Sequence, residues 1–392
     1  MRSGRTIYLD YQASTPLDPV VFREMLPFMH ESFANPHSTS HAAGWDAARA
    51  VDQSARNLAK YLGCDPDEII FTSGATEANN LAILGVRKNI KEKKRNKIIT
   101  SRIEHKSVIE ACRALADEFG AEILYCKVDS DGCLDFGHLE ELLSEQVLLM
   151  TFGSVNSEIG SVQDIMRIGR LAERYGVLFH IDGAQMPAVA SAGTASHMAS
   201  MVSLSGHKMY GPKGIGCLYV ERSVQQYLAP IVFGGGQQNG LRSGTLPVAL
   251  CVGIGAAAEL AGSQDEQRSL YSKSGKLWDA LRAIDDRIVL NGPAAANRHP
   301  GNLNIRFPGV SAEDLLASLQ PKLAASMGSA CASGIPEPSH VLRGIGLTDD
   351  EARSSIRFSV GRFTTDREIE KAAELVASVL EQFDSLGMRD AI

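Results

Sequence analysis

Three polar clusters in the sequence carry side chains that could hold a carbonyl cofactor. The stretch SLSGHKMYGPKGIG places Ser205, His207 and Lys208 directly after a short apolar run. A desolvated lysine can lose its proton and become a nucleophilic amine, or be held as an imine. A second apolar run, VLFHID, ends at Asp182, with Gln185 three residues later. A buried aspartate needs a cationic partner or several hydrogen-bond donors.

The third cluster is FTSGATEANN, where Gly74 and Ala75 turn the chain and Thr76 opens a helix. Backbone amides at a helix start, aided by a hydroxyl, form an anion site suited to a phosphate. Each cluster alone has an ordinary explanation, namely a turn, a helix cap or a surface lysine. Together they match the phosphate, the pyridine nitrogen and the aldehyde of pyridoxal phosphate. We therefore expect a Schiff base at Lys208 and a ring nitrogen kept protonated by Asp182.

The elements that must position these clusters alternate between short apolar runs and helix-length amphipathic segments. The predicted strands are 68–73, 97–101, 121–128, 147–153, 177–182, 201–205 and 216–220. This alternation predicts an α/β fold with a mostly parallel seven-stranded sheet between helices. The last two strands are joined by a turn too short for a crossover helix, so we expect that pair to be antiparallel.

The chain of 392 residues exceeds what one hydrophobic core usually holds, so we expect two domains. Residues 16–255 would form the large cofactor-binding domain. Residues 1–15 and 256–392 would form a smaller α+β domain. In this second part the predicted helices are 247–260, 265–284, 313–319 and 366–383, with strands near NLNIRF and SSIRFSV.

Composition and charge exclude several classes of function. Hydrophobic residues make up 44% and charged residues 22%, which is ordinary for a soluble globular protein. A net charge of −7 argues against binding duplex nucleic acid, and the basic run from Lys88 to Lys97 is expected to be the solvated end of a helix. No apolar segment is long enough for a signal peptide or a membrane span, so we expect a cytoplasmic location. Seven cysteines without CxxC spacing indicate neither a disulfide framework nor a metal site.

A set of motifs spread from about Ile7 to Phe383 closely resembles that of a known family. The motifs are YLDYQASTP, FANPHSTSH, FTSGATEANN, EHKSV, VNSEIG, HIDGAQ, SGHKMYGPKGIG, RSGTLP, GSACASG and SSIRFSVGRFT. They are similar to the cysteine desulfurases of the NifS/IscS type, which are pyridoxal-phosphate enzymes of fold type I. The resemblance implies sulfur removal from L-cysteine, a homodimer and a protein that accepts the sulfur, such as an iron-sulfur scaffold.

The resemblance also implies a role for each matching residue. Lys208 would form the Schiff base and later move the Cα proton, while His105 would stack on the cofactor ring and share in catalysis. The residues implied to bind the cofactor are Ala75, Thr76, His105, Asn156, Asp182, Gln185, Ser205, His207, Lys208 and Thr245. Gln185 would bond the ring hydroxyl, and Thr245 would reach the phosphate held by the other subunit. Arg357 would clamp the substrate carboxylate through two parallel hydrogen bonds, with Asn35 and Asn156 in the same pocket.

Cys331 would decide the reaction. Its surroundings, SMGSACASGIPEPS, are small residues, glycine and proline, which predict a loop rather than core. We expect the other six cysteines to be structural. A Cys331 thiolate could attack the sulfur of the substrate, giving L-alanine and a persulfide that passes to the acceptor protein.

Two alternatives remain open on the sequence alone. A selenocysteine lyase, or another fold-type I lyase or aminotransferase, would share most of these motifs. A sulfur-relay or interaction protein would retain the fold with a decayed cofactor site, which is disfavoured because all the matching positions are filled. The sequence also leaves open whether the sulfur serves iron-sulfur cluster assembly, tRNA thiolation or DNA modification.

Overall fold

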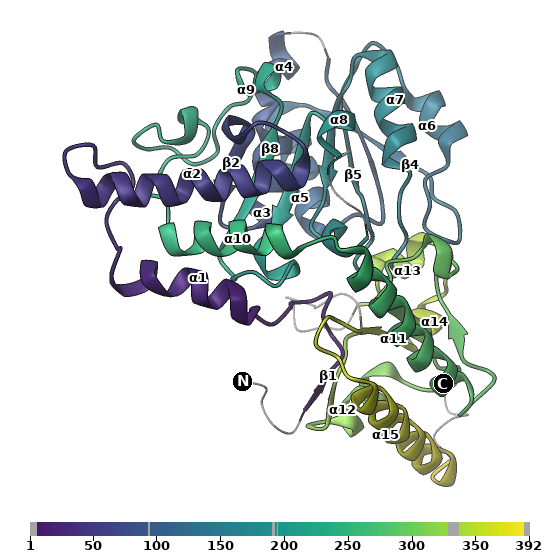
Figure 1. Ribbon diagram of the computed structural model, residues 1–392. Coiled ribbons are helices and arrows are strands. Elements are labelled where there is room, and N and C mark those ends of the chain that lie inside the picture. Colours follow the sequence, from purple (N-terminus) through teal and green to yellow (C-terminus); the bar gives the residue numbers. More distant parts are fainter. Residues whose placement is uncertain (1–5, 93–94, 190–192, 194, 328–336, 388–392) are drawn as a thin grey trace.

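The computed structural model describes residues 6–92, 95–189, 193, 195–327 and 337–387 (Figure 1). Its large sheet has seven strands in the order β2-β8-β7-β6-β5-β3-β4. These strands are β2 (Ile69–Thr72), β3 (Lys97–Ser101), β4 (Glu122–Cys126), β5 (Val147–Gly153), β6 (Leu178–Asp182), β7 (Met201–Ser205) and β8 (Gly216–Val220). All neighbours pair in parallel except β8, which is antiparallel to both β2 and β7. The predicted mostly parallel sheet, including the antiparallel pair after β7, is confirmed.

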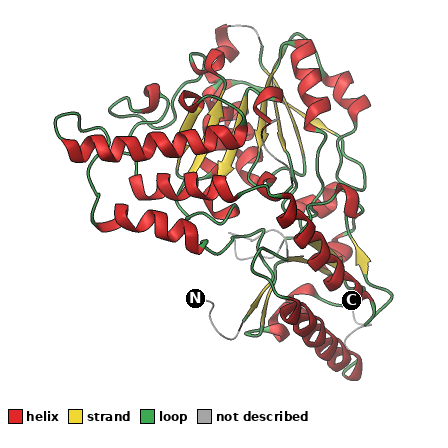
Figure 2. Cartoon of the chain, viewed as in Figure 1, coloured by secondary structure: helices red, strands yellow, loops and turns green. Residues whose placement is uncertain are grey.

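Helices cover both faces of this sheet (Figure 2). Those of the first 260 residues are α1 (Pro19–His30), α2 (Ala42–Leu62), α3 (Ala75–Gly85), α4 (Arg87–Glu92), α5 (Lys106–Phe119), α6 (Phe136–Leu142), α7 (Ile165–Tyr175), α8 (Ala195–Met198), α9 (Arg222–Gln225) and α10 (Val248–Leu260). Helices α2, α7 and α10 share a buried cluster with Phe71, Phe152 and Phe179 of the sheet. Helices α3 and α5 share a second cluster with Ile70 and Leu149. Because successive side chains of a strand face opposite sides, both faces need apolar residues, which explains the continuous apolar runs of the sequence.

The last third of the chain builds a smaller lobe around a second sheet. Its strands run in the order β12-β10-β9 and pair antiparallel. The elements are α11 (Gln264–Arg282), β9 (Val289–Leu290), β10 (Asn302–Arg306), α12 (Ala312–Leu319), β11 (Leu323–Ala324), α13 (His340–Gly344), α14 (Asp349–Arg353), β12 (Ser355–Ser359) and α15 (Asp366–Ser385). Helices α11, α12 and α15 pack on this sheet in a buried cluster of their own.

The N-terminal segment belongs to the same lobe by its contacts. Strand β1 (Ile7–Tyr8) pairs in parallel with β11, and Leu9 lies in the buried cluster of the smaller lobe. From there the backbone crosses to the large sheet, where Thr15 bonds the carbonyl oxygen of His207. The chain between these points therefore spans the two lobes.

Two local expectations differ from the structure. The basic run from Lys88 to Lys97 is predicted to be the end of a helix. Helix α4 ends at Glu92, and Lys97 is instead the first residue of strand β3. Helix α10 begins at Val248, because Pro247 takes the N-cap position with a ψ of 89°. Among the described residues, no helix is both long and apolar enough to cross a bilayer.

Candidate active site

A cavity of about 670 Å³ lies where the parallel strands end. This volume is in the range of pockets that hold a cofactor and a small substrate. The predicted residues that line it are Ala75, Thr76, His105, Asn156, Asp182, Gln185, Ser205, His207, Lys208 and Arg357. Carboxyl ends of neighbouring parallel strands meet at one edge of a sheet, so residues far apart in the sequence converge there.

One end of the cavity is formed by the start of α3. Gly74 is the N-cap with φ 156° and ψ 179°, a backbone conformation that essentially only glycine adopts, and no side chain caps the helix. A Cβ on Gly74 would lie 3.9 Å from the hydroxyl oxygen of Ser205, which places that hydroxyl beside the helix start. The first amides of an uncapped helix attract an anion. This end of the cavity therefore suits a phosphate group.

His207 lies beside this end and is held neutral. Its Nδ1 is 3.2 Å from the hydroxyl oxygen of Ser14. Burial, with the positive charges of Lys208 and Lys213, lowers the pKa of His207 to about 4. The ring can therefore take part in hydrogen bonds at neutral pH without adding a charge of its own.

Asp182 ends strand β6 and is only 8% exposed. Its Oδ2 accepts a hydrogen bond of 2.8 Å from Asn79 Nδ2, and its Oδ1 accepts one of 3.0 Å from the main-chain N–H of Ala184. Within the described part of the chain it has no ion-pair partner. A buried carboxylate without a counter-ion suits a cationic ring nitrogen, as in protonated pyridine.

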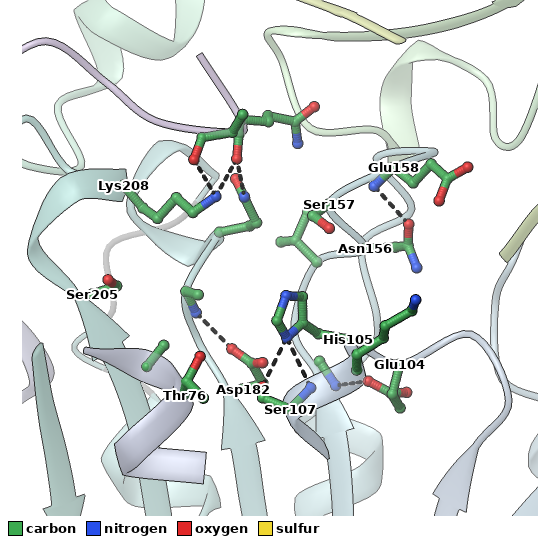
Figure 3. A pocket seen from close by; sticks show the side chains of 18 of the residues that line it. Thr76, Glu104, His105, Ser107, Asn156, Ser157, Glu158, Asp182, Ser205 and Lys208 are labelled. Carbon is green, nitrogen blue, oxygen red and sulfur yellow. Dashed lines mark hydrogen bonds between the residues drawn. The ribbon is translucent and has the colours of Figure 1, made fainter. Parts of the chain in front are cut away.

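Lys208 closes a short 3-10 turn after β7, Gly206–Lys208. Its ammonium group donates to the carbonyl oxygens of Gln12 and Ala13, the latter at 2.9 Å (Figure 3). Burial, together with the positive charge of Arg357, lowers the pKa of Lys208 to about 8. The amine is thus much easier to deprotonate than an ordinary lysine.

We expect the cofactor-free protein to capture pyridoxal phosphate faster as the pH rises toward 8. Only the neutral amine attacks a carbonyl, and its fraction grows about tenfold per pH unit below the pKa of Lys208. The rise should level off above the pKa value of about 8. Stopped-flow absorbance at a fixed cofactor concentration measures this rate. A rate that does not change between about pH 6 and pH 8 would contradict the lowered pKa.

His105 is the N-cap residue of α5. It lines the cavity, and its side chain is exposed. Its Nδ1 lies 3.1 Å from the main-chain nitrogen of Ser107, which donates to it, and 2.7 Å from the Ser107 hydroxyl oxygen (Figure 3). Because Nδ1 is an acceptor, the proton of the ring lies on Nε2. The local sequence EHKS thus both starts the helix and orients the imidazole.

Arg357 on β12 brings a positive charge from the smaller lobe into the cavity. It is 4% exposed, pairs with Asp10 at 2.7 Å and donates to the carbonyl oxygen of Ser157 at 2.9 Å. Its Nε is buried and has no hydrogen-bond partner in the described structure. A guanidinium that lines the cavity suits an incoming carboxylate.

Asn156 has its side chain engaged in the wall of the cavity. Its Nδ2 donates to the carbonyl oxygen of Ile103 at 2.9 Å. Its Oδ1 accepts from the main-chain nitrogens of Glu158 and Ile159 at 2.9 and 3.0 Å. The side chain therefore shapes the turn after β5 as well as lining the cavity.

Three predicted residues are not among those that line the cavity. Asn35 is exposed on the loop between α1 and α2, and Thr245 is exposed before α10. Figure 1 shows the turn that joins α1 and α2 at one edge of the chain. Cys331 lies outside the described residues. The six cysteines that the structure describes are all free, and burial raises the pKa of each above its usual value.

Several residues in the cavity wall were not predicted. Gln12 and Ala13 act through main-chain carbonyls, which no side-chain pattern can reveal. Glu104 and Glu158 also line the cavity, and burial raises the pKa of each carboxyl to about 7. The motifs EHKSV and VNSEIG contain these two residues and identify the segments that line the cavity. The sequence, however, does not distinguish a buried glutamate in such a motif from one on the surface.

Known proteins resemble this chain over nearly its full length. The model of the family described as "Aminotransferase class-V" matches residues 7–372. A protein described as "Cysteine desulfurase IscS" from Rickettsia bellii is 43% identical over 97% of this chain and 92% of its own length. A solved "NIFS-LIKE PROTEIN" matches 96% of this chain and 100% of its own with 30% identity and a TM-score of 0.89. A structure titled "SspA in complex with cysteine" covers 91% of this chain and 99% of its own, with 35% identity and a TM-score of 0.79.

Proposed function

Since this chain belongs to the aminotransferase class-V family and is a pyridoxal-phosphate-dependent cysteine desulfurase, we propose that the cavity described above is its active site. The relatives carry this description, so a selenocysteine lyase or another lyase is not favoured. The observation that carries the assignment to this cavity is the meeting of a low-pKa amine at Lys208 and a buried carboxylate at Asp182 that has no ion-pair partner among the described residues.

The residues present fit the cofactor. The uncapped start of α3 at Ala75 and Thr76, with Ser205 and His207, would hold the phosphate. Asp182 would pair with the ring nitrogen. Gln185 would bond the ring hydroxyl through its amide, which here donates to the carbonyl oxygen of Gln12 at 2.9 Å. When bound, pyridoxal phosphate supplies an electron sink for charge released on the substrate carbons.

Arg357, Lys208 and Cys331 would each carry out one step of the reaction. Arg357 binds the carboxylate of L-cysteine, and the neutral amine of Lys208 takes the Cα proton. The Cys331 thiolate attacks the substrate sulfur, so that an S–S bond forms as the C–S bond breaks. The sulfur stays on Cys331 as a persulfide. Cβ, which loses its bond to sulfur, gains one proton, and Cα regains the proton that Lys208 took, so that the product leaves as L-alanine.

Replacing Arg357 by lysine should raise the KM for L-cysteine by about 10- to 100-fold while kcat changes less. Lysine keeps the positive charge but loses the planar fork, and a hydrogen bond to a charged group is worth about 1.5–3 kcal/mol. Steady-state sulfide release measures both constants. Arg306→Lys is a matched control, because Arg306 pairs with Glu351 outside this cavity. A fall in kcat at unchanged KM would contradict the assignment.

The active form is proposed to be a homodimer. Phe22, Met29, Phe33 and Phe233 are 51%, 62%, 80% and 77% exposed, a set of large apolar side chains that a second copy would cover. Helix α1 and the loop after it carry the first three. Thr245 and Asn35, which do not line the cavity of their own chain, would then contribute to the site of the partner.

We propose that the sulfur passes to an acceptor protein and that the enzyme is cytoplasmic. The acceptor would be an iron-sulfur scaffold or another sulfur carrier, consistent with the IscS description of the relatives. A cytoplasmic location fits the free thiols of the six described cysteines. The division into residues 16–255 and 1–15 with 256–392 stays a proposal. The separate buried cluster of the smaller lobe favours two domains, while α10 runs past residue 255 and packs in the cluster of the large sheet.

A further inference from the structure

Asn79, in the second turn of α3, joins two parts of the proposed active site. Its side chain is fully buried, and Nδ2 donates to Asp182 Oδ2 and to Ser107 Oγ, each at 2.8 Å. An amide nitrogen carries two protons, so both are committed to these two acceptors. Asn79 is therefore a direct link between strand β6 and the start of α5.

The carboxylate of Asp182 fixes which way this amide points. Asn79 Oδ1 is buried and has no hydrogen-bond partner in the described structure. Turning the amide over would place Oδ1 against Asp182 Oδ2, two acceptors with no proton between them. The amide thus tolerates an unsatisfied oxygen in order to donate to the buried charge.

The Ser107 hydroxyl connects the Asn79 amide to the His105 ring. Since the Ser107 hydroxyl oxygen accepts from Asn79, its single proton is free to point at His105 Nδ1, 2.7 Å away. The main-chain N–H of Ser107 donates to the same Nδ1 at 3.1 Å. Two donors on one ring nitrogen disfavour a proton there. The Asn79–Ser107 relay, meaning these hydrogen bonds from Asp182 to His105, therefore favours the arrangement in which Nδ1 accepts and the ring proton lies on Nε2.

We propose that Asn79 is a positioning residue that uses the Asp182 charge to keep His105 Nδ1 a hydrogen-bond acceptor, by way of Ser107. The inference rests on the proposed active site, in which His105 would stack on a cofactor ring whose nitrogen pairs with Asp182. The same carboxylate would then bind the ring nitrogen of the cofactor and fix the orientation of the imidazole stacked on it.

The test compares Asn79→Leu, Ser107→Ala and the matched control Asn80→Leu. Asn80 is the next residue of α3, and its amide donates only within the helix, to the Thr76 carbonyl oxygen at 2.8 Å. Nitrogen-15 NMR of histidine, with His105 assigned from His105→Gln, gives the fraction of Nδ1 that is protonated at pH 7. Titration of pyridoxal phosphate into the cofactor-free protein gives its affinity. Circular dichroism confirms that each variant is folded.

Ser107→Ala should raise the protonated fraction of Nδ1 about three- to tenfold and leave the cofactor affinity within about twofold. Asn79→Leu should raise the same fraction and also weaken the affinity about 10- to 100-fold, because Asp182 loses a charged hydrogen bond. Asn80→Leu should change neither.

If the protonated fraction of Nδ1 in Asn79→Leu equals that of the parent protein, the relay is overturned, since Asn79 would then act on Asp182 alone. Should Asn79→Leu fail to fold, an unchanged protonated fraction of Nδ1 in Ser107→Ala would overturn the relay equally. These NMR results do not depend on the reaction. Failure of the active-site assignment would show separately, as full desulfurase activity in His105→Gln.

Discussion

Replacing Lys208 by alanine should abolish sulfide release from L-cysteine, with a fall of at least about 10³-fold in kcat. The amine at this position is the group with a pKa lowered to about 8, in contact with carbonyl oxygens of the N-terminal segment. Without it the chain would lack both the proposed covalent anchor of the cofactor and the proposed base for the Cα proton. Methylene blue assay of sulfide and amino-acid analysis of alanine measure the loss.

Lys276→Ala is the control for this variant. Lys276 is exposed and pairs with Asp366 on α15, so its replacement should leave the rate of sulfide release at the parent value. Lys208→Ala should still bind the cofactor through the phosphate and ring contacts, but sodium borohydride should no longer fix it to the chain. Retention of borohydride fixation would show that another lysine carries the cofactor.

Replacing Cys331 by alanine should keep the yellow absorbance of the bound cofactor but remove sulfide release, by about 10³-fold or more. The prediction rests on the loop composition around Cys331 and on the state of the other thiols. Burial, with the nearby Asp129 and Asp131, raises the pKa of Cys133 to about 11, and burial raises that of Cys112 to about 12. Such thiols are poor nucleophiles at neutral pH.

Cys133→Ala is the matched control, since Cys133 is a partly exposed thiol outside the cavity. It should release sulfide at the parent rate. Mass spectrometry after a single turnover with labelled cysteine should find the added sulfur on Cys331 in the parent protein and on no cysteine in Cys331→Ala. Sulfide release by Cys331→Ala at the parent rate would refute the persulfide mechanism.

The fold could be predicted from the sequence because its signals are local. Seven apolar runs separated by helical periodicity give the sheet, and the short turn between 205 and 216 gives the antiparallel pair. Side chains at or just after strand ends, such as Asp182 and Lys208, could be predicted to lie at one edge of the sheet for the same reason. The carboxyl ends of parallel strands converge wherever such a sheet forms.

The rest of the site depends on contacts that no local pattern encodes. Lys208 is held by carbonyl groups of residues 12 and 13, which any residue type would offer. Asn79 lies in the FTSGATEANN motif, in which the start of the helix is predicted to bind a phosphate. Its contacts with Asp182 and Ser107 form only because the fold brings β6 and α5 beside α3. Thr245, whose predicted role involves a second copy, and Asn35 are both exposed and do not line the cavity of their own chain.

The stretch from Asp10 to Ala13 touches both ends of the proposed substrate site. Asp10 holds the guanidinium of Arg357, and two residues later the carbonyl groups of Gln12 and Ala13 hold the amine of Lys208. Four consecutive residues thereby hold the Arg357 guanidinium and the Lys208 amine from one backbone segment. A shift of this segment would therefore displace both groups together.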